Sequence, residues 1–115
     1  MRVKDLGEFG LIRRIAGMLP SACDGVVVGI GDDVAVLRTS GPDYLLATCD
    51  VQVENVHFVR DWITPYQLGR KIVAINVSDI AATGGSPTFG LVSLALPPET
   101  ETDFVDGLYA GMRDQ

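Results

Sequence analysis

The sequence predicts an α+β fold, with helices packed on one face of a mainly antiparallel sheet. Two observations support this class. Short β-branched runs separated by turn residues fill much of the first half of the chain, and longer stretches of the second half have apolar residues at helical spacing. The predicted order is helix, three strands, helix, strand, helix, and a mixture of this kind is typical of α+β domains.

The first half of the chain is expected to hold one helix and three strands. Residues 8–19 form a short amphipathic pattern that Pro20 ends, and Asp24-Gly25 is a turn signal. Apolar, strand-forming runs follow it. The predicted strands are residues 26–30, 34–37 and 44–48.

The second half begins with a long helix over residues 66–82. Thr64 is the expected N-cap, Pro65 fits the first turn, and Gly84-Gly85 ends the helix. Residues 89–96 are predicted as a strand that Pro97-Pro98 ends. A last helix opens at residues 99–102, where acidic side chains suit the helix dipole.

Composition limits the classes of protein to which the chain could belong. Its 115 residues, 47% of them hydrophobic, suffice for one domain with its own core. The net charge of −6 argues against binding to DNA or RNA phosphates. No apolar run could span a bilayer, and no signal segment opens the chain. The two distant cysteines, Cys23 and Cys49, fit a reduced cytoplasmic protein.

Adjacent carboxylates follow the first predicted strand, in the sequence Gly29-Ile30-Gly31-Asp32-Asp33. Two neighbouring negative charges repel each other unless a cation is shared, and glycine lets a ligand approach the backbone closely. A hard, oxygen-preferring ion such as Mg²⁺ fits this pattern. The alternative is a solvated turn, because aspartate and glycine are ordinary turn residues.

Two further carboxylates could join such a site. Asp50 follows Thr48 and Cys49 at the end of a predicted strand, and it could share an ion with Asp33 if their strands pair. Asp79 continues an apolar row on a helix that is apolar nearly all round and is therefore predicted to be buried. A buried carboxylate is costly unless it is paired or bound to metal. The alternative for both is a carboxylate that faces water.

His57 and Lys71 are the remaining polar candidates. His57 is the only histidine, so a zinc site is not expected, and a loop histidine bonded to backbone is the alternative reading. Lys71 could reach a phosphate or lie along the helix flank, as we expect for Arg70. Walker, dinucleotide-binding, serine-hydrolase and zinc-protease motifs are all absent.

A series of short stretches resembles the N-terminal part of the thiamine-monophosphate kinase family, which is related to aminoimidazole-ribonucleotide synthase. Any one stretch is weak, but together they cover nearly the whole chain in order. They are GEFGLI at residues 7–12, GIGDDVAVL at 29–37, TCD at 48–50, VHF at 56–58, GRK at 69–71, NVSDIAA at 76–82 and LALP at 94–97.

The resemblance implies transfer of the γ-phosphoryl group of ATP to thiamine monophosphate, which gives thiamine diphosphate. It assigns magnesium ions to Asp33, Asp50 and Asp79, with oxygens from Thr48 and Cys49 beside them. His57 would lie against the substrate, and Asp32 and Lys71 would lie near the phosphates. No acid–base catalytic residue is expected, because the acceptor is already an anionic phosphate oxygen.

The resemblance also implies how the chain is organised. Residues 1–115 would form a single N-terminal domain for ATP, magnesium and dimerisation, with residues 1–25 as a helix and lead-in. The sheets would pair in a homodimer. The family's C-terminal domain would lie beyond Gln115, so the chain alone is expected to be inactive. Alternatives are a related ATP-using synthase and a non-catalytic nucleotide-binding or dimerisation module.

Two positions depart from the family pattern. Cys49 stands where threonine is usual, which weakens metal binding if a hydroxyl is the ligand and is harmless if the backbone carbonyl is. Gly85 replaces the usual alanine after the long helix, and we expect no consequence from it.

Overall fold

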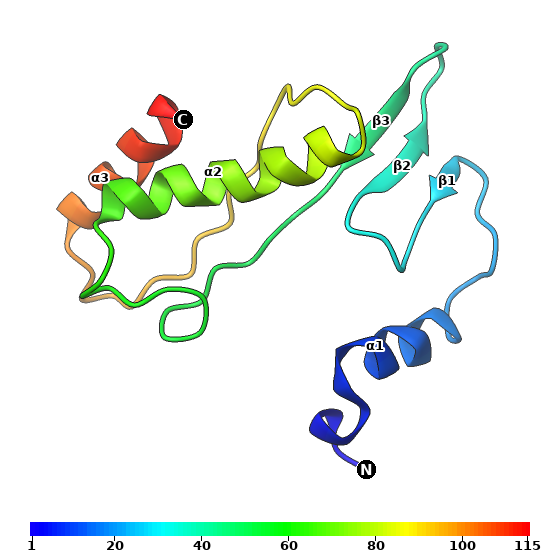
Figure 1. Ribbon diagram of the computed structural model, residues 1–115, viewed down its shortest axis with the longest axis horizontal. Helices are drawn as coiled ribbons and strands as arrows, with labels where there is room; N and C mark the ends of the chain where they lie inside the picture. The colour runs from blue at the N-terminus through cyan, green and yellow to red at the C-terminus, as the bar shows by residue number, and fades with distance from the viewer. The chain divides into compact units, whose positions relative to one another are not determined.

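A computed structural model describes all residues 1–115, which form two compact units. The first unit, Met1–Thr48, contains helix α1 (Val3–Ala16) and strands β1 (Val26–Val28), β2 (Ala35–Arg38) and β3 (Tyr44–Ala47). The second unit, Cys49–Gln115, contains helices α2 (Pro65–Ala82) and α3 (Thr102–Asp114) (Figure 1). The order of these elements is the predicted one except for the strand at residues 89–96.

Helix α1 begins earlier than residue 8, the predicted start. Asp5 in its first turn accepts a hydrogen bond from the Arg2 backbone N–H at 2.8 Å, which starts the helix near Val3. Gly7 interrupts it with φ 68° and ψ 177°, a conformation that glycine adopts readily because it has no Cβ. The predicted helix is therefore present, but it ends at Ala16 rather than at Leu19, and it follows a short extra turn on the other side of a kink.

The three strands form an antiparallel sheet in the order β1-β2-β3. Strands β2 and β3 pair without interruption from Ala35 opposite Ala47 to Arg38 opposite Tyr44, whereas the pairing of β1 with β2 contains an irregularity between Val26 and Val28. Val34, directly before β2, is buried. The predicted antiparallel arrangement of these three strands is confirmed.

Helix α2 has the predicted N-terminus. The Thr64 hydroxyl accepts a hydrogen bond from the Gln67 N–H at 3.1 Å, and the Gln67 side chain accepts one from the Thr64 N–H at 3.0 Å. This reciprocal capping box satisfies two backbone donors that the helix leaves free, and Pro65 needs no donor in the first turn. Beyond the other end of α2, Gly84 adopts φ 80°.

Helix α3 packs closely against the first turns of α2, as Figure 1 shows for the red and green helices. Leu68 and Leu108 are buried, and Gly69 and Gly111 bring the two backbones together. At one edge of this pair, the Tyr66 hydroxyl donates to Asp114 at 3.1 Å. The second unit is therefore built around a helix pair that small residues allow to approach closely.

A surface ion pair at the end of α3 adds to this contact. The Arg113 guanidinium donates to Asp114 at 2.9 Å. This hydrogen bond and the one from Tyr66 lower the pKa of Asp114, and the bond to Asp114 raises the pKa of Arg113. Both groups are exposed to water, so the pair contributes little to stability.

Two expectations about the second unit are wrong. Residues 89–96 form no strand, because no other strand pairs with them, and Phe89 and Leu91 are fully exposed. Helix α2 is not buried all round: only Leu68 and Gly69 are buried, since α3 is the one helix that packs broadly against it. Asp79 is consequently half-buried.

None of the helices is both long enough and apolar enough to cross a bilayer.

Candidate functional site

The loop between β1 and β2 carries the two adjacent aspartates. Gly31 has φ 105°, a value that L side chains rarely adopt, so glycine permits the reversal of the chain at this point. The Asp32 carboxylate accepts a hydrogen bond from the Val34 N–H at 3.2 Å. This bond closes a local turn, and it gives Asp32 a structural contact in addition to the predicted role near phosphates.

Asp33 has a different environment from Asp32. Its carboxylate is exposed and has neither a hydrogen bond nor an ion pair with the protein. Its backbone carbonyl accepts a hydrogen bond from the Thr48 hydroxyl at 2.8 Å. The pairing of Ala35 with Ala47 explains this contact, because it places the residues before β2 opposite those after β3. Two of the predicted metal ligands, Asp33 and Thr48, are thus neighbours.

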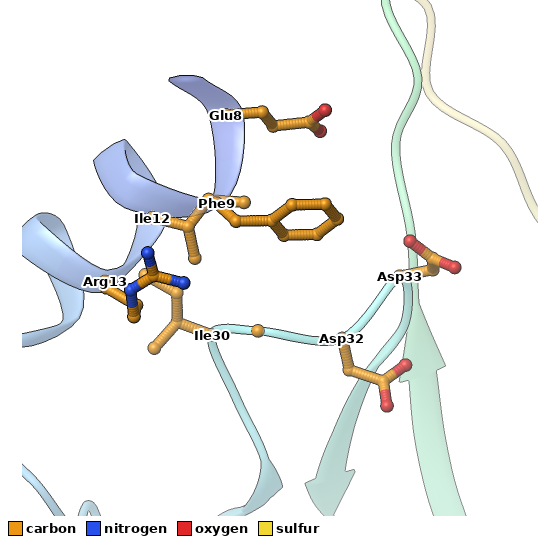
Figure 2. Close-up of a pocket in the computed structure, with 8 residues that line it drawn as sticks. Glu8, Phe9, Ile12, Arg13, Ile30, Asp32 and Asp33 are labelled. Carbon is orange, nitrogen blue, oxygen red and sulfur yellow. The ribbon is translucent and has the colours of Figure 1, made fainter. Parts of the chain in front are cut away.

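A shallow hollow of about 480 Å³ lies beside this loop within the first unit (Figure 2). Figure 2 shows Phe9 and Ile12 of α1 facing the loop, while the carboxylates of Asp32 and Asp33 point away from each other. The remaining lining residues are Glu8, Arg13, Ile30 and Gly31. The hollow combines an apolar side with carboxylates and with the Arg13 guanidinium.

The second unit carries the other two predicted carboxylate ligands. Asp50 is exposed, and Asp79 is half-buried in the last turns of α2. Neither carboxylate has a hydrogen-bond or ion-pair partner in the protein. The neighbouring Asn76 side chain donates to the Ile72 carbonyl at 2.9 Å, so it is occupied within the helix. Both carboxylates are therefore free to bind a cation or water.

His57 belongs to a tight loop that several short hydrogen bonds hold. The imidazole Nδ1 of His57 accepts from the Val53 backbone N–H at 2.9 Å, and the backbone N–H of His57 donates to the Val53 carbonyl at 2.8 Å. The Lys71 ammonium donates to the His57 carbonyl at 2.8 Å. The structure thus brings His57 and Lys71 together, a contact that the sequence patterns did not indicate.

The predicted site residues are divided between the two units. Asp32, Asp33 and Thr48 are close together in the first unit, and His57 is close to Lys71 in the second. Cys49, a free and exposed thiol, lies with Asp50 and Asp79 in the second unit. Neither unit by itself gathers three or more His, Cys, Asp or Glu side chains. The magnesium cluster as a whole stays a prediction.

Sequence reasoning gave no role to several residues around these groups. Phe9 and Ile12 belong to the GEFGLI stretch, yet nothing in its helical pattern indicated that they would face the aspartate loop. Val53 holds His57 through backbone atoms alone. Such a contact has no signature in residue type, so only the folded backbone reveals it.

Comparison with known proteins defines the class to which this architecture belongs. The family model described as "AIR synthase related protein, N-terminal domain" matches residues 31–115, and the chain belongs to this family. Relatives named thiamine-monophosphate kinase align with nearly all of the chain. The one from Aquifex aeolicus is 43% identical over 113 residues, which are 98% of this chain and 34% of the relative.

Other relatives with the same name give similar values. The Corynebacterium glutamicum protein is 40% identical over 114 residues, covering 98% of this chain and 33% of its own length. The Bacillus subtilis protein is 42% identical over 109 residues, covering 95% of this chain and 33% of its own length. The chain therefore spans about a third of the length of these curated relatives. No solved structure matches the chain.

Proposed function

We propose that this chain is the nucleotide- and magnesium-binding part of an enzyme that transfers the γ-phosphoryl group of ATP to thiamine monophosphate, forming thiamine diphosphate. The observation that carries the proposal is the alignment of nearly the whole chain with relatives named thiamine-monophosphate kinase, at up to 43% identity. The motifs that resemble this family include each predicted ligand position. The membership of residues 31–115 in the AIR synthase related family supports the same class.

Asp33, Asp50 and Asp79 would hold magnesium, with oxygens of Thr48 and Cys49 beside them. Their donor chemistry fits, because magnesium prefers carboxylate and other oxygen ligands and none of the three carboxylates is used by another protein group. The bound ions would neutralise charge on the transferred phosphoryl group. The Thr48 hydroxyl fixes the Asp33 backbone, so the position of Asp33 does not depend on the metal alone.

The remaining residues would bind and orient the two phosphorylated molecules. Phosphoryl transfer depends mainly on positioning and charge neutralisation, and the acceptor oxygen of thiamine monophosphate needs no base at neutral pH. We assign no acid–base catalytic residue for this reason. His57 would contact the acceptor substrate. Asp32 would lie near the phosphates of ATP and Lys71 near the phosphates that the reaction brings together, although each also makes a hydrogen bond to the backbone.

A chimeric enzyme tests the proposal. Residues 1–115 of this chain would replace the aligned N-terminal third of the Aquifex aeolicus relative. We expect the chimera to form thiamine diphosphate from thiamine monophosphate and ATP when magnesium is present, and to lose this activity with excess chelator. Thiamine diphosphate would be measured by chromatography, with the unaltered relative as the positive control.

The outcomes of this assay separate the alternatives. Consumption of ATP without thiamine diphosphate, in a folded chimera, would favour a related ATP-using synthase. Magnesium-dependent ATP binding by the chain, without turnover in the chimera, would favour a non-catalytic nucleotide-binding module. Either result contradicts the kinase proposal.

We also propose that the chain forms a homodimer in which the sheets of two copies pair. Exposed apolar side chains of the sheet, among them Val27, Tyr44 and Leu45, support this, because side chains of this size are better covered by another surface. We expect sedimentation analysis of the chain above micromolar concentration to give the mass of a dimer. A strictly monomeric mass would contradict the proposal.

A further inference from the structure

Residues 53–58 form a loop in which the imidazole and the backbone of His57 both form hydrogen bonds with Val53. The Val53 backbone N–H donates to His57 Nδ1 at 2.9 Å, and the Val53 carbonyl accepts from the backbone N–H of His57 at 2.8 Å. Asn55 has φ 63°, and its N–H donates to the Phe58 carbonyl at 2.7 Å. These bonds fix both the backbone and the ring of His57 with respect to the same residue.

The bond to Val53 determines where the imidazole carries its proton. A neutral imidazole has one N–H donor and one acceptor nitrogen. Because Nδ1 accepts from the Val53 N–H, the neutral ring has its proton on Nε2. No group of the chain bonds to Nε2, so His57 has one free donor, Nε2–H. Such a donor suits an anionic phosphate oxygen.

Lys71 is the one side chain outside the loop that bonds to the His57 backbone. Its ammonium donates to the His57 carbonyl at 2.8 Å, and it thereby links the loop to α2. The neighbouring Arg70 does not contact the loop in this way, because its guanidinium donates to the Gln115 side chain at 2.9 Å. Without the ammonium, an exposed loop of this length would sample more conformations, since loop bonds are weak in water.

We propose that Lys71 is a positioning residue: through the His57 carbonyl it holds the imidazole so that Nε2–H is presented to an anionic oxygen of the phosphorylated acceptor substrate. The identity of that acceptor rests on the proposed function. A donor that is already oriented loses less conformational freedom when the substrate binds. Lys71 therefore acts on acceptor binding through His57, and its effect should be seen first in the ring itself.

Nuclear magnetic resonance of the chain tests the first step. The chain has a single histidine, so the imidazole nitrogen signals belong to His57 without further assignment. We expect the unaltered chain to show one neutral tautomer, with the proton on Nε2. In Lys71→Met the signals should move toward a mixture of both tautomers, whereas Lys71→Arg and the matched control Arg70→Met should retain the original pattern. Unchanged signals in a folded Lys71→Met chain would overturn the proposal.

Kinetics of the chimera test the second step. Loss of an ordered donor should raise KM for thiamine monophosphate about 10-fold in Lys71→Met and leave KM for ATP within about twofold, with recovery in Lys71→Arg. A rise confined to KM for ATP would overturn the proposal, because Lys71 would then act on the nucleotide phosphates. If the unaltered chimera is inactive, the kinase proposal fails. A tautomer change in Lys71→Met would still support the positioning role, and its absence would still overturn it.

Discussion

Replacing Asp33 and Asp79 together with asparagine is expected to abolish magnesium-dependent ATP binding by the chain and to lower kcat/KM of the chimera by about 100-fold or more. Asparagine preserves the size of each side chain but removes one negative charge, and magnesium depends on carboxylate charge for affinity. Neither carboxylate has a partner in the protein, so the substitutions break no protein contact. Titration calorimetry with ATP, with and without magnesium, measures the loss of binding.

The control is a double variant with the same change in charge. Asp43→Asn with Asp106→Asn removes one exposed carboxylate from each unit, at positions without a predicted role in metal binding. We expect this control to bind ATP like the unaltered chain, because diffuse surface charge is screened by salt. Undiminished magnesium-dependent binding in Asp33→Asn with Asp79→Asn would remove both residues from the metal site, and the proposed mechanism with them.

The parts of the fold that depend on residues close together in the sequence were predicted well. The N-terminus of α2 followed from Thr64, Pro65 and the spacing of apolar residues, because a helix cap needs only contacts within one turn. The strand at residues 89–96 failed for the opposite reason. Its largely apolar run favours an extended backbone, but a strand exists only where another strand supplies hydrogen bonds.

The candidate site shows the same division. The expected pairing of β2 with β3 is confirmed, and this pairing brings the Thr48 hydroxyl to the Asp33 carbonyl. The contact of Lys71 with the His57 carbonyl could not be predicted, because it depends on where an exposed loop lies beside α2. Residue type indicated only that Lys71 could reach a phosphate or lie along the helix flank, and its contact with a backbone carbonyl depends on where the loop lies.

Gly111→Ala is expected to destabilise the helix pair of the second unit by about 3 kcal/mol, although alanine is intrinsically the better helix former by about 1 kcal/mol. A Cβ at Gly111 would overlap the Tyr66 carbonyl oxygen and approach the Tyr66 carbonyl carbon to 2.8 Å and the Arg70 nitrogen to 3.1 Å. All three are backbone atoms of α2, so no side chain can rotate away. The helices would have to separate, which uncovers Leu68 and Leu108.

The reciprocal site strengthens this expectation, because a Cβ at Gly69 would overlap the Leu108 carbonyl oxygen and lie 2.9 Å from the Met112 nitrogen. The matched control is Gly90→Ala, where a Cβ meets nothing within 4 Å, and its free energy of unfolding should change by less than about 0.5 kcal/mol. Denaturant unfolding monitored by circular dichroism measures both variants. If Gly111→Ala is as stable as the original chain, a Cβ at this position meets no backbone atom of α2. Helices α2 and α3 would then be farther apart than this geometry requires.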